Sequence, residues 1–76
     1  MQHNQAVREA QAWARAHGVS GKVTCSSGFK SPAGLSRRAD FVCLVRRSAG
    51  DCTVLHVSEP PRVRLLHEHA DCVQPL

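Results

Sequence analysis

Only one segment of this chain has apolar side chains at helical spacing, so the fold is limited to one helix and a mainly extended remainder. Over residues 5–17, alanines, a valine and Trp13 recur every three or four positions, and charged side chains occupy the other side. Asn4 is a suitable N-cap, Gly18 is well placed just after the last turn, and Val19 can fold back on that turn. The sequence therefore predicts an amphipathic helix over 5–17.

The remainder of the chain has the pattern of strands and turns. Apolar and β-branched runs at 41–47 and 52–58 flank turn-forming residues at 48–51, and together they predict a β-hairpin. Pro60 and Pro61 end the hairpin because proline cannot donate a hydrogen bond to a strand ladder. The predicted fold class is α+β, an N-terminal helix packed on a three- to four-stranded antiparallel sheet. The expected organisation is one small domain, 1–76, with a helix (5–17), a short strand (22–25), a long Ser/Gly/Pro loop (26–40), the hairpin (41–58), a strand (62–69) and a tail (70–76).

A chain of 76 residues supports only a thin core. Aromatic residues make up 4% of it, so the core has to be built from Val, Leu, Ala and cysteine. Such a domain often gains stability from an oligomer, and a homodimer is therefore an expectation. The longest apolar run, 41–45, is too short to cross a bilayer, and no apolar segment typical of a secretory signal follows the polar N-terminus. We accordingly expect a cytoplasmic protein without a membrane partner.

The pairing of the strands decides which side chains share a face of the sheet. A hairpin closed at residues 49–50 places Cys43 opposite His56, and a tight turn at the two prolines places His56 opposite Val63. On this register, the helix is expected to cover Phe41, Cys43, Val45, Cys52, Val54, His56, Val63, Leu65 and His67.

The same register leaves a second apolar face that none of the predicted elements covers. An exposed apolar patch with a charged border is typical of a surface that binds a partner or dimerises. Basic residues of the long loop extend this surface; the alternative is that the loop folds over the face and removes the patch. The predicted partner-binding residues are Val42, Leu44, Leu55 and Val57 on the face, Arg46, Arg62 and Arg64 at its rim, and Lys30, Arg37 and Arg38 in the loop.

The four cysteines raise the question of disulfides or a metal site. They form no C-x-x-C pair, and their spacing matches no zinc-ligand motif, so we expect free thiols, no metal and no cofactor. On the predicted register, Cys43 and Cys52 lie about 13 Å apart, which is too far for a bridge. A bond between Cys25 and Cys72 is compatible with the sequence. If a metal were bound, the most compact set of ligands would be Cys52, His67, His69 and Cys72.

No motif in the chain indicates catalysis. Residues 28–31 end in Lys-Ser, like a phosphate-binding loop, but lack its glycine spacing. The formal net charge of +4 is compatible with a nucleic-acid partner, although the scarcity of aromatic residues disfavours base stacking. The sequence therefore predicts a small non-enzymatic protein-binding module, a regulator or inhibitor that occludes a partner protein. The alternatives are a basic nucleic-acid-binding accessory protein and, with less support, a small zinc-binding domain.

Overall fold

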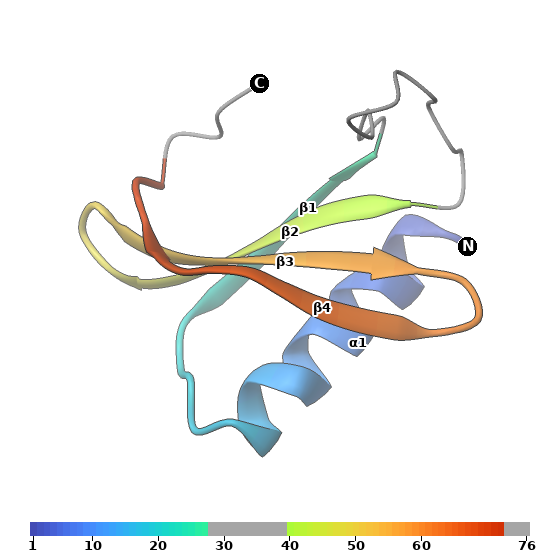
Figure 1. The fold of residues 1–76 in the computed structure, drawn as a ribbon, viewed down its shortest axis with the longest axis horizontal. Helices are drawn as coiled ribbons and strands as arrows, with labels where there is room; N and C mark the ends of the chain where they lie inside the picture. Colours follow the sequence, from blue (N-terminus) through green and yellow to red (C-terminus); the bar gives the residue numbers. More distant parts are fainter. Residues whose placement is uncertain (28–39, 73–76) are drawn as a thin grey trace.

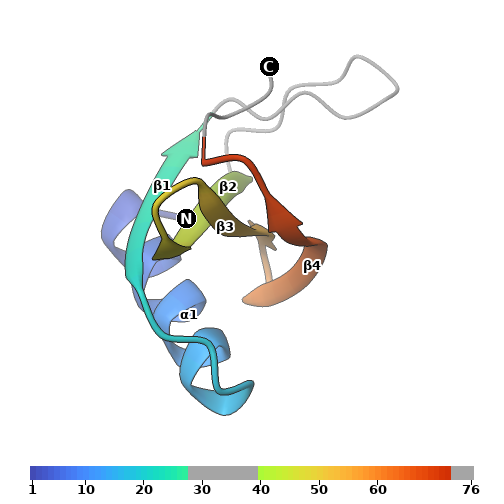
Figure 2. The same ribbon diagram turned by 90° about the vertical axis from the view of Figure 1, so that its left-hand side faces the viewer.

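One N-terminal helix packs against a four-stranded antiparallel sheet, so the predicted α+β class is confirmed. The computed structural model describes residues 1–27 and 40–72. The strands neighbour one another in chain order, and α1 lies across one face of the sheet (Figure 1, Figure 2). Residues 28–39 of the predicted loop and 73–76 of the predicted tail lie outside the described residues. The elements are α1 (His3–Ala16), β1 (Lys22–Ser27), β2 (Phe41–Ser48), β3 (Asp51–Ser58) and β4 (Arg62–Ala70).

The C-terminal end of α1 has the fold-back that the sequence predicts, whereas the helix begins two residues early. Gln2, and not Asn4, is the N-cap, and it makes no side-chain capping hydrogen bond. At the other end, Gly18 adopts a φ of +68°, and the backbone N–H of Val19 donates to the carbonyl oxygen of Ala14 at 2.8 Å. Within the described ranges, no helix is long and apolar enough to span a membrane.

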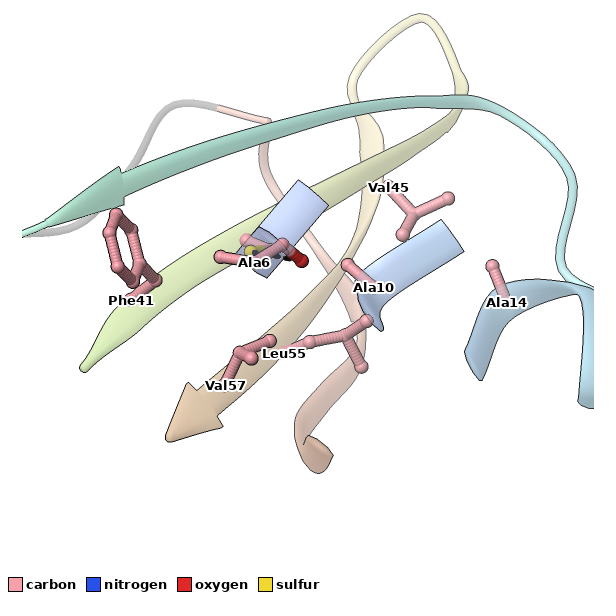
Figure 3. Close-up of a cluster of buried hydrophobic side chains, with 8 residues drawn as sticks. Ala6, Ala10, Ala14, Phe41, Val45, Leu55 and Val57 are labelled. Carbon is pink, nitrogen blue, oxygen red and sulfur yellow. Dashed lines mark hydrogen bonds between the residues drawn. The ribbon is translucent and has the colours of Figure 1, made fainter. Parts of the chain in front are cut away.

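The hydrophobic core lies between α1 and the sheet (Figure 3). The buried residues of α1 are alanines, Ala6, Ala10 and Ala14, all at most 4% exposed, and Trp13 packs against the core while partly buried. Because the alanine side chains are short, the strands have to supply most of the core volume. Leu55 of β3 is the largest fully buried side chain. The other buried core side chains are Phe41, Cys43, Val45 and Val57.

The turn between β2 and β3 is predicted correctly, but the register beyond it is wrong by one residue. Ser48 pairs with Asp51 across the turn, as expected. A bulge follows at Arg47, so the next pair joins Arg46 to Cys52. Because side chains alternate between the two faces of a strand, one inserted residue exchanges the predicted faces of β3.

Next to the turn, the register between β3 and β4 is also wrong by one residue, because the turn at residues 59–61 is longer than the tight turn predicted at the two prolines. Ser58 therefore pairs with Arg62. The second shift offsets the first for β4, so Val63 packs on the helix side, as predicted. Beyond Leu65 the β3–β4 ladder shifts twice more by one residue, so His67 of β4 points away from the helix, contrary to the prediction.

These register shifts change the composition of both faces. Leu55 and Val57 are fully buried beneath α1 and do not belong to the second face. Nor is that face an exposed apolar patch, since Val42 is 7% and Val54 is 4% exposed. Among the large apolar side chains of residues 1–27 and 40–72, the exposed one is Leu65. The residues that were predicted to face the helix, and that point away from it, are Cys52, Val54, His56 and His67.

All four cysteines are bonded in pairs, so the prediction of free thiols is wrong. Cys25 and Cys43 lie directly opposite each other on β1 and β2, with Cα atoms 4.0 Å apart. Cys52 of β3 is bonded to Cys72, which follows β4, and the Cα–Cα distance is 5.0 Å. The two bonds have sequence separations of 18 and 20. Loops of that size stabilise a chain by about 3 kcal/mol each in the chain-entropy description, which supports a thin core.

Candidate functional site

The face of the sheet that is turned away from α1, called the far face below, carries the candidate site. Directly paired residues of neighbouring strands share a face, so the pairs define rows across the sheet. The rows at the two ends carry charged side chains, and the middle row is more apolar. From the β2–β3 turn outward, the rows are Lys22, Arg46 and Cys52, then Thr24, Leu44, Val54 and His67, then Ser26, Val42, His56 and Arg64.

A hollow of about 130 Å³ lies on the far face near the β2–β3 turn. Its lining combines two cations, a hydroxyl, a leucine side chain and a disulfide. Such a lining can hold an anionic group by its charge and an adjoining methylene by apolar contact. The lining residues are Lys22 and Thr24 of β1, Leu44 and Arg46 of β2, Cys52 of β3, and Cys72.

The position of β1 beside β2 brings the two cations together. Gly21 precedes β1 and lies against the backbone of Arg46, where a Cβ atom would be 1.9 Å from the Arg46 carbonyl oxygen. Glycine allows this close approach because it has no side chain. The Cys25–Cys43 disulfide joins the two strands at directly opposed positions. With the strands aligned in this way, Lys22 lies opposite Arg46.

Lys22 and Arg46 are exposed like charges on neighbouring strands. Like charges that are directly opposed on a sheet repel each other. In the described part of the chain, neither side chain takes part in an ion pair; Glu59, Asp40 and Asp51 pair with the N-terminus and with two histidines instead. An anion bound between the two cations would relieve their repulsion, which makes the hollow a candidate anion-binding site.

The hollow contains two of the predicted partner-binding residues, Leu44 and Arg46. Leu55 and Val57 lie beneath α1, and Val42 is buried on the far face. A partner therefore cannot reach the leucine and the valine of β3 in this fold.

The basic rim predicted from the sequence is divided between the two ends of the sheet. Arg46 pairs with Cys52, and Arg64 pairs with His56. These two β3 positions are four residues apart, which corresponds to about 13 Å along the strand. Arg62 lies further away, at the β3–β4 turn. The loop residues Lys30, Arg37 and Arg38 lie outside the described residues.

The metal-ligand set that the sequence allows is not formed. Cys52 and Cys72 are bonded to each other, and thiolates are the form in which cysteine binds metals. The geometry at His69 fits a ring whose Nδ1 donates to Asp51 Oδ1 at 3.0 Å and whose Nε2 accepts from Arg47 Nη1 at 3.4 Å. The described residues hold no group of three or more His, Cys, Asp or Glu side chains that could bind a metal ion.

Lys22, Thr24 and the disulfide at the hollow are not among the residues predicted to bind a partner. One signal in the sequence could have indicated Lys22. If Cys25 and Cys43 are directly opposed on antiparallel strands, then Lys22, three residues before Cys25, lies opposite Arg46, three residues after Cys43. The expectation of free thiols concealed this alignment.

Comparisons with protein-family models, with curated proteins and with solved structures found no match to this chain. The arguments for its function therefore come from the geometry of the far face.

Proposed function

We propose that this chain is a small non-enzymatic protein-binding module, a regulator or inhibitor that occludes a surface of a partner protein. In this proposal, the hollow on the far face binds an acidic side chain of the partner. The observation that carries the proposal is the adjacent pair of exposed cations, Lys22 and Arg46, beside Leu44 in one hollow. Arginine binds a carboxylate with two parallel hydrogen bonds, and a neighbouring lysine adds a second positive charge.

The size of the hollow favours a side chain over a free ligand. Its volume of about 130 Å³ is well below the roughly 300–1,000 Å³ of most small-molecule sites. A glutamate side chain could place its carboxylate between the two cations and its methylenes against Leu44. A specific protein interface also needs about 800 Å² from each partner, so the remaining contacts would come from the rest of the far face, including Arg64 and His67.

The lining of the hollow supports recognition rather than catalysis, because a lysine, an arginine, a hydroxyl and a leucine position and neutralise an anion. The expected homodimer and the expected cytoplasmic location stay predictions. The two disulfides weigh against the cytoplasm, because thiols are kept reduced there.

Nucleic-acid binding is the competing outcome, since a phosphate would fit between the same two cations. Three units of the +4 formal charge come from Lys30, Arg37 and Arg38, and residues 28–39 contain no acidic residue. The remaining residues are nearly balanced in charge, and the cations of the sheet are divided between its two ends. This distribution favours a local acidic contact over a continuous phosphate-binding ridge.

The proposal can be tested by NMR titration of the ¹⁵N-labelled protein with a short polyglutamate peptide. We expect amide shifts at the hollow, and their loss when Lys22→Glu is combined with Arg46→Glu. The matched control combines Arg8→Glu with Arg15→Glu, which makes the same charge change on exposed positions of α1 and should leave the shifts unchanged.

The same titration with a short single-stranded oligonucleotide separates the two partner classes. Tighter binding of the oligonucleotide, with an affinity that falls steeply as salt is raised, would assign the surface to nucleic acid. Peptide shifts that lie away from the hollow, or that disappear equally in the α1 control, would contradict the proposed site.

A further inference from the structure

The two disulfides lie on opposite faces of the sheet and have different surroundings. The core disulfide, Cys25–Cys43, lies between α1 and the sheet, where Cys43 is 0% exposed. The hollow disulfide, Cys52–Cys72, lines the hollow on the far face together with the two cations. Each disulfide joins a partly exposed cysteine, Cys25 or Cys72, to a buried one, so access does not distinguish the two bonds. Thiol–disulfide exchange also needs a stable leaving thiolate, and the hollow disulfide has two cations beside it.

Access to the hollow disulfide is through Cys72. This residue is partly exposed, whereas Cys52 is 1% exposed. The Cys72 Sγ atom lies 4.0 Å from the carbonyl oxygen of Ser48, and Cys72 is one of the residues that line the hollow. An incoming thiolate would therefore attack Cys72 Sγ and displace the sulfur of Cys52.

Two cations share the row of Cys52 on the far face, and the Cys52 sulfur is the leaving group. Cys52 lies directly opposite Arg46, which lies directly opposite Lys22. Directly paired residues have Cβ atoms only about 4.5–5.5 Å apart, so Arg46 is the nearer cation and Lys22 lies one strand further from Cys52. Cations beside a cysteine favour its thiolate form, and they also attract an anionic thiol.

The acidic side chains next in sequence do not line the hollow. Asp51 precedes Cys52, and its carboxylate lies 3.0 Å from His69 Nδ1. Asp71 is exposed and does not line the hollow.

We propose that Cys52–Cys72 is a thiol–disulfide exchange site. The thiolate of a thiol R–SH attacks Cys72 Sγ, a new R–S–Sγ bond forms on Cys72, and the Cys52–Cys72 bond breaks. Cys52 leaves as a thiolate and takes up the proton that R–SH gave up, so the products are a mixed disulfide on Cys72 and a thiol on Cys52. A second R–SH releases Cys72 as a thiol and leaves as R–S–S–R. This activity goes beyond partner binding and does not depend on it. Reduction breaks the disulfide that lines the hollow, while the core disulfide still joins β1 to β2.

The test is a time course of the oxidised protein with reduced glutathione, quenched by alkylation and mapped by mass spectrometry. We expect Cys52 and Cys72 to react first, while Cys25 and Cys43 stay bonded. Combining Lys22→Gln with Arg46→Gln should slow the reaction about tenfold, because two charges near the leaving thiolate are lost. The control combines Arg8→Gln with Arg15→Gln on α1 and should keep the rate of the unmodified chain.

Simultaneous reduction of both disulfides, or earlier reduction of Cys25–Cys43, would overturn the assignment. It would also be overturned if Cys52–Cys72 reacted first but at a rate that the Lys22 and Arg46 substitutions left unchanged. A circular dichroism spectrum of each variant before reduction checks that the exposed substitutions leave the fold intact. Failure of the peptide titration would not affect this result, because glutathione is the only reactant.

Discussion

Leu55→Ala and Leu44→Ala delete the same atoms from neighbouring strands but on opposite faces of the sheet. Leu55 is 0% exposed beneath α1, whereas Leu44 is partly exposed at the hollow. The sequence-based register places both leucines on one outer face, and the observed register separates them. The difference between the two variants in the free energy of unfolding therefore measures which register is present.

The expected cost at Leu55 follows from its surroundings. It is the largest fully buried side chain among the described residues, and the buried positions of the helix above it are alanines, which are too short to fill the space that the substitution leaves. Deletions of this kind cost about 2–5 kcal/mol, and we expect about 3–4 kcal/mol here because the site cannot collapse easily. At Leu44 solvent can occupy the space, so we expect about 1 kcal/mol. A difference of about 2.5 kcal/mol corresponds to roughly 10–20 °C in melting temperature for a domain of this size.

The assay is urea unfolding with the disulfides intact, followed by the fluorescence of Trp13. This residue is the single tryptophan of the chain; it packs against the core and stacks on His17 with ring centroids 4.0 Å apart. Equal slopes of the unfolding free energy against urea would confirm that stability alone has changed. If Leu44→Ala destabilises the protein as much as Leu55→Ala, the observed register of β3 is refuted, and with it the far face as described.

Three further predictions test other parts of the fold. Gly21→Ala would place a Cβ atom 1.9 Å from a β2 carbonyl oxygen, so it should cost about 2 kcal/mol and speed amide hydrogen exchange along β1. Ala10→Leu should lower stability by about 1–3 kcal/mol in thermal unfolding, because the residue is 0% exposed, whereas Ala12→Leu at an exposed position of the same helix should change it by less than about 0.5 kcal/mol. Combining Cys25→Ala with Cys43→Ala should cost about 3 kcal/mol in urea, and a loss below about 1 kcal/mol would show that this cross-link contributes little.

Of the candidate site, the sequence identifies Leu44 and Arg46 but not their neighbours in the hollow. Both lie on β2, whose faces depend only on the alternation within that strand. Lys22 joins them through the pairing of β1 with β2, and this pairing is recognisable only once Cys25 and Cys43 are known to be bonded. Cysteine spacing by itself does not determine connectivity, since four cysteines allow three pairings.

The sequence by itself determined the features that short stretches of chain can specify. The helical period over 5–17, the fold-back at Gly18 and Val19, and the turn at 49–50 each depend on residues within a few positions of one another. Together with two apolar runs and a pair of prolines, they are enough to predict the α+β class and the order of its elements.

Only the tertiary structure decided which side chains share a face. The bulge at Arg47 and the longer turn at 59–61 each shift a ladder by one residue, and each shift reverses the faces of a strand relative to its neighbour. Whether such an extra residue is accommodated depends on how well the whole sheet packs against α1. No interaction within β3 alone distinguishes its two faces. The packing against α1 therefore decides that Leu55 lies under the helix and that Cys52 lines the hollow.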